Sequence, residues 1–248
     1  METVVSFSKP KLWQIPNISD ATNRSLSEKS AALEKRLRFI LSQHQKVKLA
    51  SSLAVEDMVI TDMLVNIAAD AEVFTLETGR LNPETLSLID ILAEHYPMLK
   101  FKLYKPDAKA VEAYTSNKGL NAFYESVDLR KECCRIRKVE PLNRALADAG
   151  AWLTGQRREQ SVTRTELAFA EQDTARGIAK YNPIYDWSEE DVWAYIRCHS
   201  VPYNSLYEQG YPSIGCEPCT RPIRAGEEIR AGRWWWESKD SKECGLHK

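Results

Sequence analysis

Val47-Lys-Leu-Ala-Ser-Ser-Leu-Ala-Val-Glu-Asp57 takes the chain from an apolar run into a helical pattern. The run from Val47 to Leu53 predicts a strand, and the pattern from about Glu56 to Ala68 predicts the helix behind it. The same order of segments is repeated further along by Glu72 to Leu76, Pro83 to Tyr96, Lys100 to Lys105 and Ala151 to Thr154. Strands that alternate with helices predict the α/β class, with a parallel sheet connected by crossover helices.

Capping motifs predict where further helices begin. Ser25-x-x-Glu28 is a capping box, so we expect the first helix to start near Ser25. Ser188-x-x-Asp191 is a second capping box and predicts a helix late in the chain. Between them, Lys131 to Lys138 predicts one helix. Pro141 then predicts the first turn of the next helix, where a backbone N–H is not needed.

Length and composition predict one main domain. The chain has 248 residues, 43% of them apolar, which is enough for one sizeable core. We expect an irregular segment 1–24, a single α/β domain 25–236 and a flexible tail 237–248. No apolar run approaches the roughly 18 residues of a membrane span, and the first residues lack the basic-then-apolar order of a secretory signal. The sequence therefore predicts a cytoplasmic protein without a membrane segment.

Charge is nearly balanced overall but not locally. Lys and Arg number 34 and Asp and Glu number 35, which gives a net charge of −1. Proteins that bind long nucleic acids carry a basic face, so this balance argues against a nucleic-acid partner. Two local groups of basic residues, beside cysteines, suit a small anion or an anionic cluster. They are Arg130, Lys131, Arg135, Arg137 and Lys138, and Arg221, Arg224, Arg230 and Arg233.

Four of the six cysteines form two close pairs, Cys133-Cys134 and Cys216-x-x-Cys219. In a reducing compartment such pairs indicate metal binding or thiol chemistry and argue against a disulfide framework. Adjacent cysteines on a helix point in different directions. An iron-sulfur cubane, with a different iron for each thiolate, accommodates this better than one tetrahedral zinc. Zinc and unliganded thiols stay open as alternatives.

Cys244 is a candidate nucleophile near the end of the chain. The segment Glu237 to Glu243 is a polar tether, and His247 could help to keep the thiol ionised. A thiol on such a tail could alternate between two partners; an incidental terminal cysteine is the alternative. Cys198 ends an apolar helical pattern, and we interpret it as a core or boundary residue.

The first strand ends at a candidate phosphate site, Ser51 and Ser52. Doubly wound sheets bind phosphate on free backbone amides where a strand passes into a helix. This loop contains no glycine, however, and Glu56 and Asp57 would repel an anion at the helix start. An ordinary strand-to-helix turn is the alternative.

Two later strand ends carry further candidates. Thr78 and Gly79 follow the second strand and could meet a nucleotide at the carboxyl edge of the sheet. Arg157 and Arg158 follow the strand that ends at Gly155, and arginine forks bind phosphate or sulfate in bidentate fashion. A glycine-ended turn and a solvated loop are the alternatives.

These motifs occur together in one family. They are Glu132-Cys-Cys-Arg-Ile-Arg-Lys138, Gly155-Gln-Arg-Arg158, Gly215-Cys-Glu-Pro-Cys-Thr-Arg221, Arg230-Ala-Gly-Arg-Trp-Trp-Trp-Glu237 and Glu243-Cys-Gly-Leu-His247. From about Ser51 to the C-terminus the chain closely resembles thioredoxin-dependent adenosine 5'-phosphosulfate reductases, in the branch that carries a 4Fe-4S cluster. The resemblance implies an adenine nucleotide alpha-hydrolase-like fold related to ATP pyrophosphatases. The glycine-free first loop fits, since these reductases hold no ATP pyrophosphate.

The resemblance also implies a mechanism and a site. The Cys244 thiolate attacks the sulfur of adenosine 5'-phosphosulfate and expels AMP, and thioredoxin then releases sulfite from the cysteine S-sulfonate. One 4Fe-4S cluster on the two cysteine pairs is a structural and electrostatic element, and no nicotinamide or flavin is implied. The implied cluster ligands are Cys133, Cys134, Cys216 and Cys219. The implied substrate-binding residues are Ser51, Ser52, Thr78, Gly79, Lys138, Arg157, Arg158, Arg230, Arg233 and His247.

Other functions stay open at this point. A phosphoadenosine-phosphosulfate reductase would need further cations for the 3'-phosphate, which the sequence cannot place. The glycine-free loop argues against an ATP-consuming adenylyltransferase or pyrophosphatase. A non-catalytic zinc or cluster-bearing module for RNA is disfavoured by the near-zero net charge. The oligomeric state also stays open, a homo-oligomer included.

Overall fold

Strand β1 (Val47–Ala50) lies inside one mostly parallel sheet of the computed structural model, which describes residues 10–160 and 166–238. Within these residues the sheet has six strands in the order β3-β2-β1-β4-β6-β5. Every neighbouring pair is parallel except β5 and β6. The predicted α/β class with a parallel sheet is confirmed. The other strands are β2 (Glu72–Leu76), β3 (Phe101–Tyr104), β4 (Ala151–Leu153), β5 (Ala170–Asp173) and β6 (Ile178–Tyr181).

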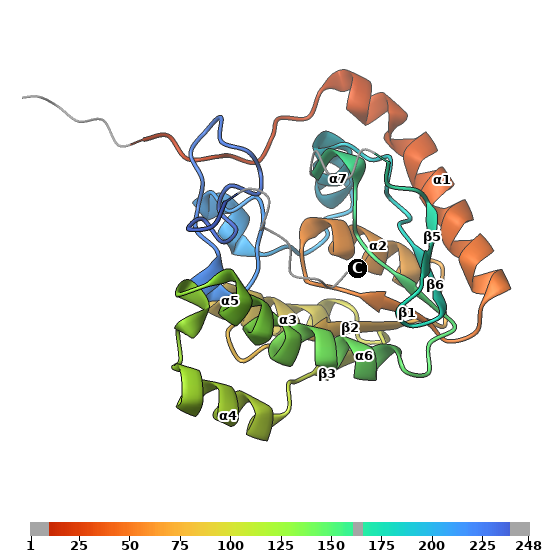
Figure 1. Cartoon of the computed structure of the whole chain (residues 1–248). Helices are drawn as coiled ribbons and strands as arrows, with labels where there is room; N and C mark the ends of the chain where they lie inside the picture. The colour runs from red at the N-terminus through yellow and green to blue at the C-terminus, as the bar shows by residue number, and fades with distance from the viewer. Residues whose placement is uncertain (1–9, 161–165, 239–248) are drawn as a thin grey trace, which may run out of the picture.

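Helices cover both faces of this sheet, with α1, α2 and α7 on the upper side and α5 and α6 on the lower side in Figure 1. Side chains alternate along each strand. Val47 and Leu49 therefore face the core that α1, α2, α3 and α7 share, while Phe74 and Trp152 face α6. The helices are α1 (Asp20–Gln43), α2 (Val55–Asn66), α3 (Pro83–His95), α4 (Ala108–Lys118), α5 (Val127–Cys134), α6 (Glu140–Leu146) and α7 (Glu189–Cys198).

The strand order places a switch point between β1 and β4. The chain moves outward from β1 through β2 to β3, then returns to add β4 on the other side of β1. The loops that leave β1 and β4 therefore meet at the carboxyl ends of these strands, where this topology predicts a crevice. Open α/β sheets bind their ligands at such a crevice.

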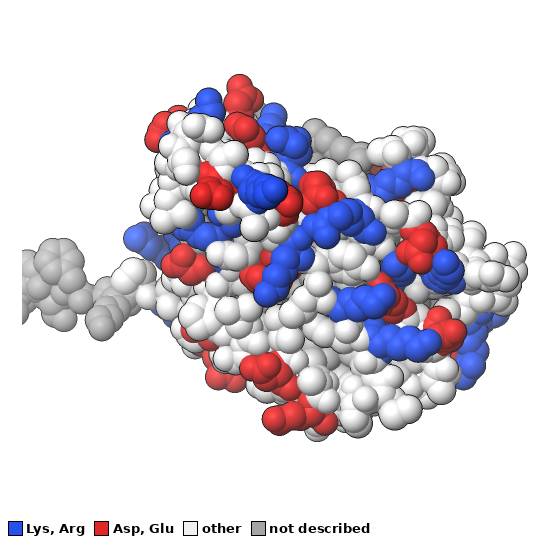
Figure 2. Space-filling view, turned by 90° about the horizontal axis from the view of Figure 1, so that it is seen from below, with Lys and Arg blue, Asp and Glu red and all other residues white. Residues whose placement is uncertain are grey.

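Charged side chains also link the sheet to its lower cover. Lys48 on β1 is buried, and its Nζ donates to Ala145 O and to Asp148 Oδ1, both at 2.7 Å. These contacts fasten the end of α6 to the centre of the sheet. On the surface seen from below, Lys and Arg are interspersed with Asp and Glu (Figure 2), in keeping with the net charge of −1.

The first helix begins earlier than predicted. α1 starts at Asp20, where the Ser19 hydroxyl accepts a hydrogen bond from Thr22 N. Ser25 lies inside the helix and donates its hydroxyl to Thr22 O at 3.1 Å, so the predicted start at Ser25 is wrong. The hydroxyl of Ser19 also donates to Glu190 of α7 at 3.0 Å. This contact between distant segments favours Ser19, and a local motif cannot reveal it.

The cysteine pair lies on a longer helical segment than predicted. α5 begins at Val127 and continues through a π-helical turn, Arg135–Val139, directly into α6. Pro141 lies in the first turn of α6, as predicted, but no break separates α6 from the helix that carries the cysteines. In the wide turn Glu140 N–H donates to Arg135 O, five residues back, and Pro141 follows where no N–H donor is required. π turns are frequent at functional sites, and this one carries Lys138.

Two elements have no clear signal in the sequence. The β5–β6 hairpin contains few large apolar residues, and α4 has a single buried residue, Tyr114. The hairpin is defined by strand pairing, since β6 pairs with both β4 and β5. The helix α4 is mostly exposed, so it lacks the apolar pattern of a helix that packs on a core. Among the described helices none has the length and apolar content to cross a lipid bilayer.

Candidate active site

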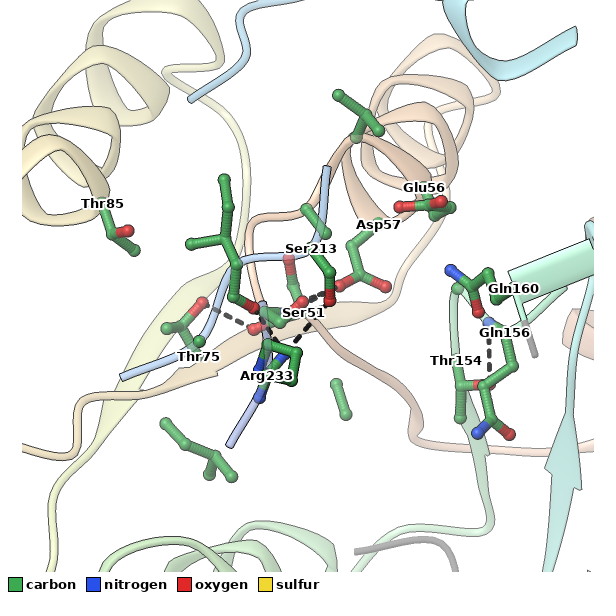
Figure 3. Close-up of a pocket in the computed structure, with 18 of the residues that line it drawn as sticks. Ser51, Glu56, Asp57, Thr75, Thr85, Thr154, Gln156, Gln160, Ser213 and Arg233 are labelled. Atoms are coloured by element: carbon green, nitrogen blue, oxygen red, sulfur yellow. Dashed lines mark hydrogen bonds between the residues drawn. The ribbon is translucent and has the colours of Figure 1, made fainter. Parts of the chain in front are cut away.

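A cavity of about 220 Å³ lies at the carboxyl ends of β1, β2 and β4, where the strand order reverses. Its walls come from the loops after these strands, the π-helical turn and the segment that contains Cys216 and Arg233. In Figure 3, Arg233 lies beside Ser51, and Gln156 lies across the cavity. The crevice expected from the topology is therefore a real cavity, built from segments that are far apart in sequence.

The loop after β1 is closed by its own side chains. Ser51 Oγ accepts from Leu53 N at 3.1 Å, and Leu53 has a left-handed backbone with φ of 62°. Ser52 donates its N–H and its hydroxyl to Asp57 Oδ2, at 2.7 and 2.8 Å. Both serines line the cavity. A side-chain carboxylate, however, already occupies the Ser52 amide that a phosphate would use at this helix start.

The end of β4 comes very close to the start of α2. A Cβ on Gly155 would lie 2.4 Å from Asp57 Oδ1 and 2.9 Å from Glu56 Cβ, so only glycine fits. The enclosure also affects ionisation: burial raises the pKa of Asp57 to about 7, although hydrogen bonds from Ser52 and Gly155 favour the ionised form. Asp57 is thus a buried carboxyl group that titrates near neutral pH.

Arg157 lines the cavity, but its guanidinium is already paired. Nη2 and Nε donate to Glu56 Oε1 at 2.8 and 3.1 Å, and the side chain is only 2% exposed. Glu159 accepts from Nη1 of the same guanidinium at 3.1 Å. Burial, opposed by Arg157 and reinforced by Glu56 and Glu159, raises the pKa of Glu189 to about 7. This side of the cavity is therefore rich in hydrogen-bond acceptors.

Three cationic residues, Lys138, Arg230 and Arg233, also line the cavity. Arg233 is buried, and its Nη1 donates to Ile214 O at 3.0 Å. Its guanidinium packs on Gly215, where a Cβ would lie 2.4 Å from Nη2. Among the described residues, the Nε of Arg233 has no hydrogen-bond partner. A buried donor without a partner is costly, so the arrangement suits an anionic ligand that accepts from it.

The two cysteine pairs come together beside this cationic side. Cys216 lines the cavity, and its Sγ lies 3.3 Å from Thr78 Oγ1. Although burial opposes it, the charge of Lys138 and the hydrogen bond to Thr78 lower the pKa of Cys216. Burial, Cys216 and Cys134 raise the pKa of Cys219 to about 12, and burial and Cys216 raise that of Cys133. In the described part of the chain no three His, Cys, Asp or Glu side chains are placed to hold a single metal ion.

Some predicted residues lie apart from the cavity or outside the described ranges. Gly79 is exposed and donates its N–H to Glu77 Oε1 at 2.6 Å, and Arg158 donates to Leu167 O at 2.8 Å; neither lines the cavity. Cys244 and His247 fall beyond residue 238 and are not described.

Cys198 is exposed at the end of α7, so its interpretation as a core or boundary residue is wrong. The apolar residues of α7 face the core up to Ile196. The helix then ends with residues on its solvent side.

Gln156 and Glu189 line the cavity but are not among the predicted site residues. Gln156 is 7% exposed, and its Oε1 has no hydrogen-bond partner among the described residues. Glu189 is the first residue of α7, next to the predicted cap Ser188. The position of Gln156 inside the Gly155-to-Arg158 motif was a usable signal. Nothing in the sequence brings the start of α7 to the β1 loop.

We predict that Asp57→Asn flattens the dependence of stability on pH. The carboxyl has a pKa of 3.8 when unfolded and about 7 when folded, so its contribution is fully present below pH 3.8 and is lost as pH rises through 7. We expect the free energy of unfolding of the wild type to fall by roughly 2–4 kcal/mol more than that of the variant over this range. Urea titrations at several pH values measure the difference.

Asp148→Asn is the control, because the pKa of Asp148 is lowered in the folded protein and that of Asp57 is raised. Lys48 and Lys46 lower the pKa of Asp148 to about 2, so its contribution is lost only as pH falls through 2. This variant should keep the wild-type slope between pH 4 and 7. An Asp57→Asn slope equal to that of the wild type would contradict the raised pKa of Asp57.

Comparison with known proteins assigns the chain to a family. The family described as Phosphoadenosine phosphosulfate reductase domain matches residues 46–222. A protein of Neisseria meningitidis serogroup B named Adenosine 5'-phosphosulfate reductase is 60% identical over 248 residues, the full length of both chains.

Solved structures agree with this match. The phosphoadenylyl-sulfate (PAPS) reductase of Candida auris in a phosphate complex has a TM-score of 0.67 at 27% identity, over 84% of this chain and 100% of that one. An FMN adenylyltransferase of Candida glabrata has a TM-score of 0.59 at 12% identity, over 95% and 82%, a likeness of fold alone. The predicted nucleotide-hydrolase-like fold is confirmed, and the chain belongs to the phosphoadenosine phosphosulfate and adenosine 5'-phosphosulfate reductase family.

Proposed function

We propose that this protein reduces adenosine 5'-phosphosulfate to sulfite and AMP, with the thioredoxin dithiol as electron donor. The observation that carries the proposal is the Nε of buried Arg233, which has no hydrogen-bond partner in the described part of the chain, in a cavity that Lys138 and Arg230 also line. An activated sulfate would supply the missing acceptor. The close relatives named adenosine 5'-phosphosulfate reductase support the same substrate.

The cavity offers suitable surroundings for each part of such a nucleotide. Leu76, Leu81 and Ile214 provide apolar wall for a purine. The cationic residues suit the phosphosulfate. The Oε1 of Gln156, which accepts no hydrogen bond from residues 10–160 and 166–238, suits a donor such as a ribose hydroxyl. A ligand with one anionic end and one donating end matches this division of the cavity.

The chemistry begins with the Cys244 thiolate. It attacks the sulfur of the phosphosulfate, a bond forms between the two sulfur atoms, and the bond from sulfur to the phosphate oxygen breaks, so that AMP leaves with the electron pair. A thioredoxin thiolate then attacks Cys244 Sγ and expels sulfite. The second thioredoxin thiol resolves the mixed disulfide, which restores Cys244 and leaves thioredoxin oxidised.

Electrostatics explain why cations are needed at the first step. A thiolate that approaches an anionic sulfuryl group meets a repulsion of about 4 kcal/mol at 4 Å in an effective dielectric near 20. Such a penalty would slow the reaction by roughly three powers of ten. Lys138, Arg230 and Arg233 offset it by neutralising the group under attack. His247 could keep the attacking thiol ionised. A cytoplasmic location is proposed with this mechanism, because it requires a reduced thiol.

We predict that Cys244→Ser abolishes formation of the covalent intermediate. Intact-mass measurement after mixing the wild type with adenosine 5'-phosphosulfate, without thioredoxin, should show one added sulfonate on Cys244. The hydroxyl of serine is not ionised at neutral pH, so the variant should show none and should release no sulfite with thioredoxin. Cys198→Ser, a change at an exposed cysteine of the described region, is the control and should react as the wild type does. Sulfite production by Cys244→Ser would refute the mechanism.

The cysteine pairs fit a 4Fe-4S cluster by the chemistry of their donors. Burial and the nearby Cys216 raise the pKa values of Cys133 and Cys219, and Cys134 also raises that of Cys219, so the four thiols lie close together. Cationic side chains, Lys138 among them, lie beside these cysteines. An anionic cluster held by these thiolates would supply a fixed negative charge next to the substrate cations. We propose that these four residues hold it, with Lys138 between the cysteines and the substrate.

We predict that protein purified without oxygen is brown and contains iron and labile sulfide in equal amounts. Cys219→Ser should remove most of the visible absorption and lower the iron content, because it takes away one of the four ligands. Cys198→Ser should change neither. Colourless protein that contains zinc would overturn the cluster and favour a zinc site on the same residues.

Reduction of phosphoadenosine phosphosulfate is the alternative, and the acceptor-rich side of the cavity argues against it. Glu56, Asp57 and Glu189 line that side, and Arg157 is paired with Glu56. A 3'-phosphate directed there would meet like charges and no unpaired cation among these residues.

We predict that kcat/KM is about 100-fold higher for adenosine 5'-phosphosulfate than for the 3'-phosphorylated substrate. A full like-charge contact costs about 4 kcal/mol, or roughly 1000-fold, and the cost is smaller here because Asp57 and Glu189, with pKa values of about 7, are only partly ionised at neutral pH. Steady-state assays of sulfite release measure both values. Inhibition by AMP and by adenosine 3',5'-bisphosphate tests binding without the chemical step. Equal efficiencies, or tighter inhibition by the bisphosphate, would favour the alternative.

A further inference from the structure

A buried ion pair joins the cysteine helix to the segment that leads to the C-terminus. Arg130 Nε and Nη2 donate to the two carboxylate oxygens of Glu237 at 2.9 and 2.8 Å. The side chains of this pair are 0% and 3% exposed. Arg130 lies on α5, three and four residues before Cys133 and Cys134. A pair this enclosed is unusual, because two charges leave water only where both are fully bound.

The same guanidinium packs on an indole that also contacts a cavity residue. The Cζ of Arg130 is 4.6 Å from the ring centroid of Trp234, and the Cζ of Arg233 is 5.0 Å from it. Trp234 is 1% exposed and has a left-handed backbone with φ of 40°. The backbone N–H of Trp234 donates to Cys219 O at 3.1 Å, and the backbone N–H of Glu237 donates to Trp234 O at 2.9 Å. Arg130, Trp234, Arg233 and Glu237 thus form one connected unit, here called the indole clamp.

We propose that Arg130 is a positioning residue for the reaction: through the indole clamp it holds Arg233 in the cavity and fixes the point from which the chain continues to Cys244. This inference rests on the proposed function. Arg130 itself does not line the cavity, and it would act through Trp234 and Glu237. Its side chain also makes a hydrogen bond with Cys134, so the iron content of each variant separates an effect on the cysteines from an effect on the indole clamp.

The position of Glu237 matters because it limits how far the sulfur of Cys244 can lie from the clamp. Cys244 follows Glu237 by seven residues, so an extended chain places its sulfur within about 25 Å of Glu237. A thiol attached at a fixed point is present at a high local concentration, and a longer or displaced attachment lowers that concentration. Freeing residues 233–237 would move the attachment point and loosen Arg233 in the same step.

The geometry of the guanidinium explains why an arginine is required at position 130. Its planar guanidinium can bond Glu237 through two nitrogens and pack on an aromatic ring at the same time. A lysine ammonium keeps the charge but cannot make the bidentate contact. Exposed pairs on this chain are different, since Arg38 and Glu34 on α1 are 59% and 43% exposed and contribute little.

The test is single-turnover sulfonation of the full-length protein with its metal content retained. Wild type, Arg130→Lys and Glu237→Gln are mixed with saturating adenosine 5'-phosphosulfate without thioredoxin, and the mass of the intact chain is followed over time. Glu34→Gln is the matched control, a charge removed from an exposed pair on α1. Reduction of the isolated S-sulfonate by dithiothreitol is followed separately, and iron is measured in every sample.

Displacement of Arg233 and of the attachment point of Cys244 lowers the sulfonation rate constant, whereas a loss of folded protein lowers the final amount of adduct. We expect the sulfonation rate constant of Arg130→Lys and Glu237→Gln to fall by at least ten-fold while the final amount of adduct stays at the wild-type level. The dithiothreitol step, the iron content and the Glu34→Gln control should be unchanged. A lower amount of adduct formed at the wild-type rate indicates only misfolded protein and overturns the inference. Wild-type rates in both variants overturn it as well.

If a single substitution prevents folding, Arg130→Met combined with Glu237→Met removes both charges together. Replacing a buried ion pair by apolar side chains is often neutral or stabilising. The double variant should fold and still sulfonate at least ten-fold more slowly, and a wild-type rate in it would again overturn the inference. A wild type that forms no adduct would instead defeat the proposed function, and the inference with it.

Discussion

The close approach of β4 to the first turn of α2 is the constraint on which the cavity depends. Gly155 leaves no room for a side chain against Asp57, and the Asp57 carboxylate in turn binds the amide and hydroxyl of Ser52. The two loops at the switch point of the sheet are thereby fixed to each other. Next to them, the buried pair of Arg157 and Glu56 joins the β4 loop to α2.

This closure has a chemical consequence for the ligand. A helix start with free amides attracts phosphate, but here Asp57 already binds the amide of Ser52 in the preceding loop, and the Val55 amide donates to the Tyr207 hydroxyl. The cationic residues of the cavity are Lys138, Arg230 and Arg233, and the proposed function assigns anion binding to them. The cavity therefore has an acceptor-rich side and a cationic side. A nucleotide with an activated sulfate fits this division better than a triphosphate does.

The cationic side depends on packing around buried aromatic and glycine residues. Gly215 makes room for the guanidinium of Arg233, and Trp234 lies against both Arg233 and Arg130. Lys138 comes from the π-helical turn that follows the cysteine pair, and its charge lowers the pKa of Cys216. These cationic residues and the cysteines are thus neighbours because two segments, about 80 residues apart in the chain, pack together.

Local pattern was sufficient for the fold class, for most strands and for the residue types of the site. Apolar runs and capping motifs report on a few neighbouring residues, and so they located β2 to the residue and the cap of α7. They misplaced the start of α1 and missed the β5–β6 hairpin, because contacts with distant residues decide both. The motif Gly155-Gln-Arg-Arg158 predicted an anion site, which stays a prediction. Only packing revealed that Glu56 neutralises Arg157, since a residue type specifies a charge and not its partner.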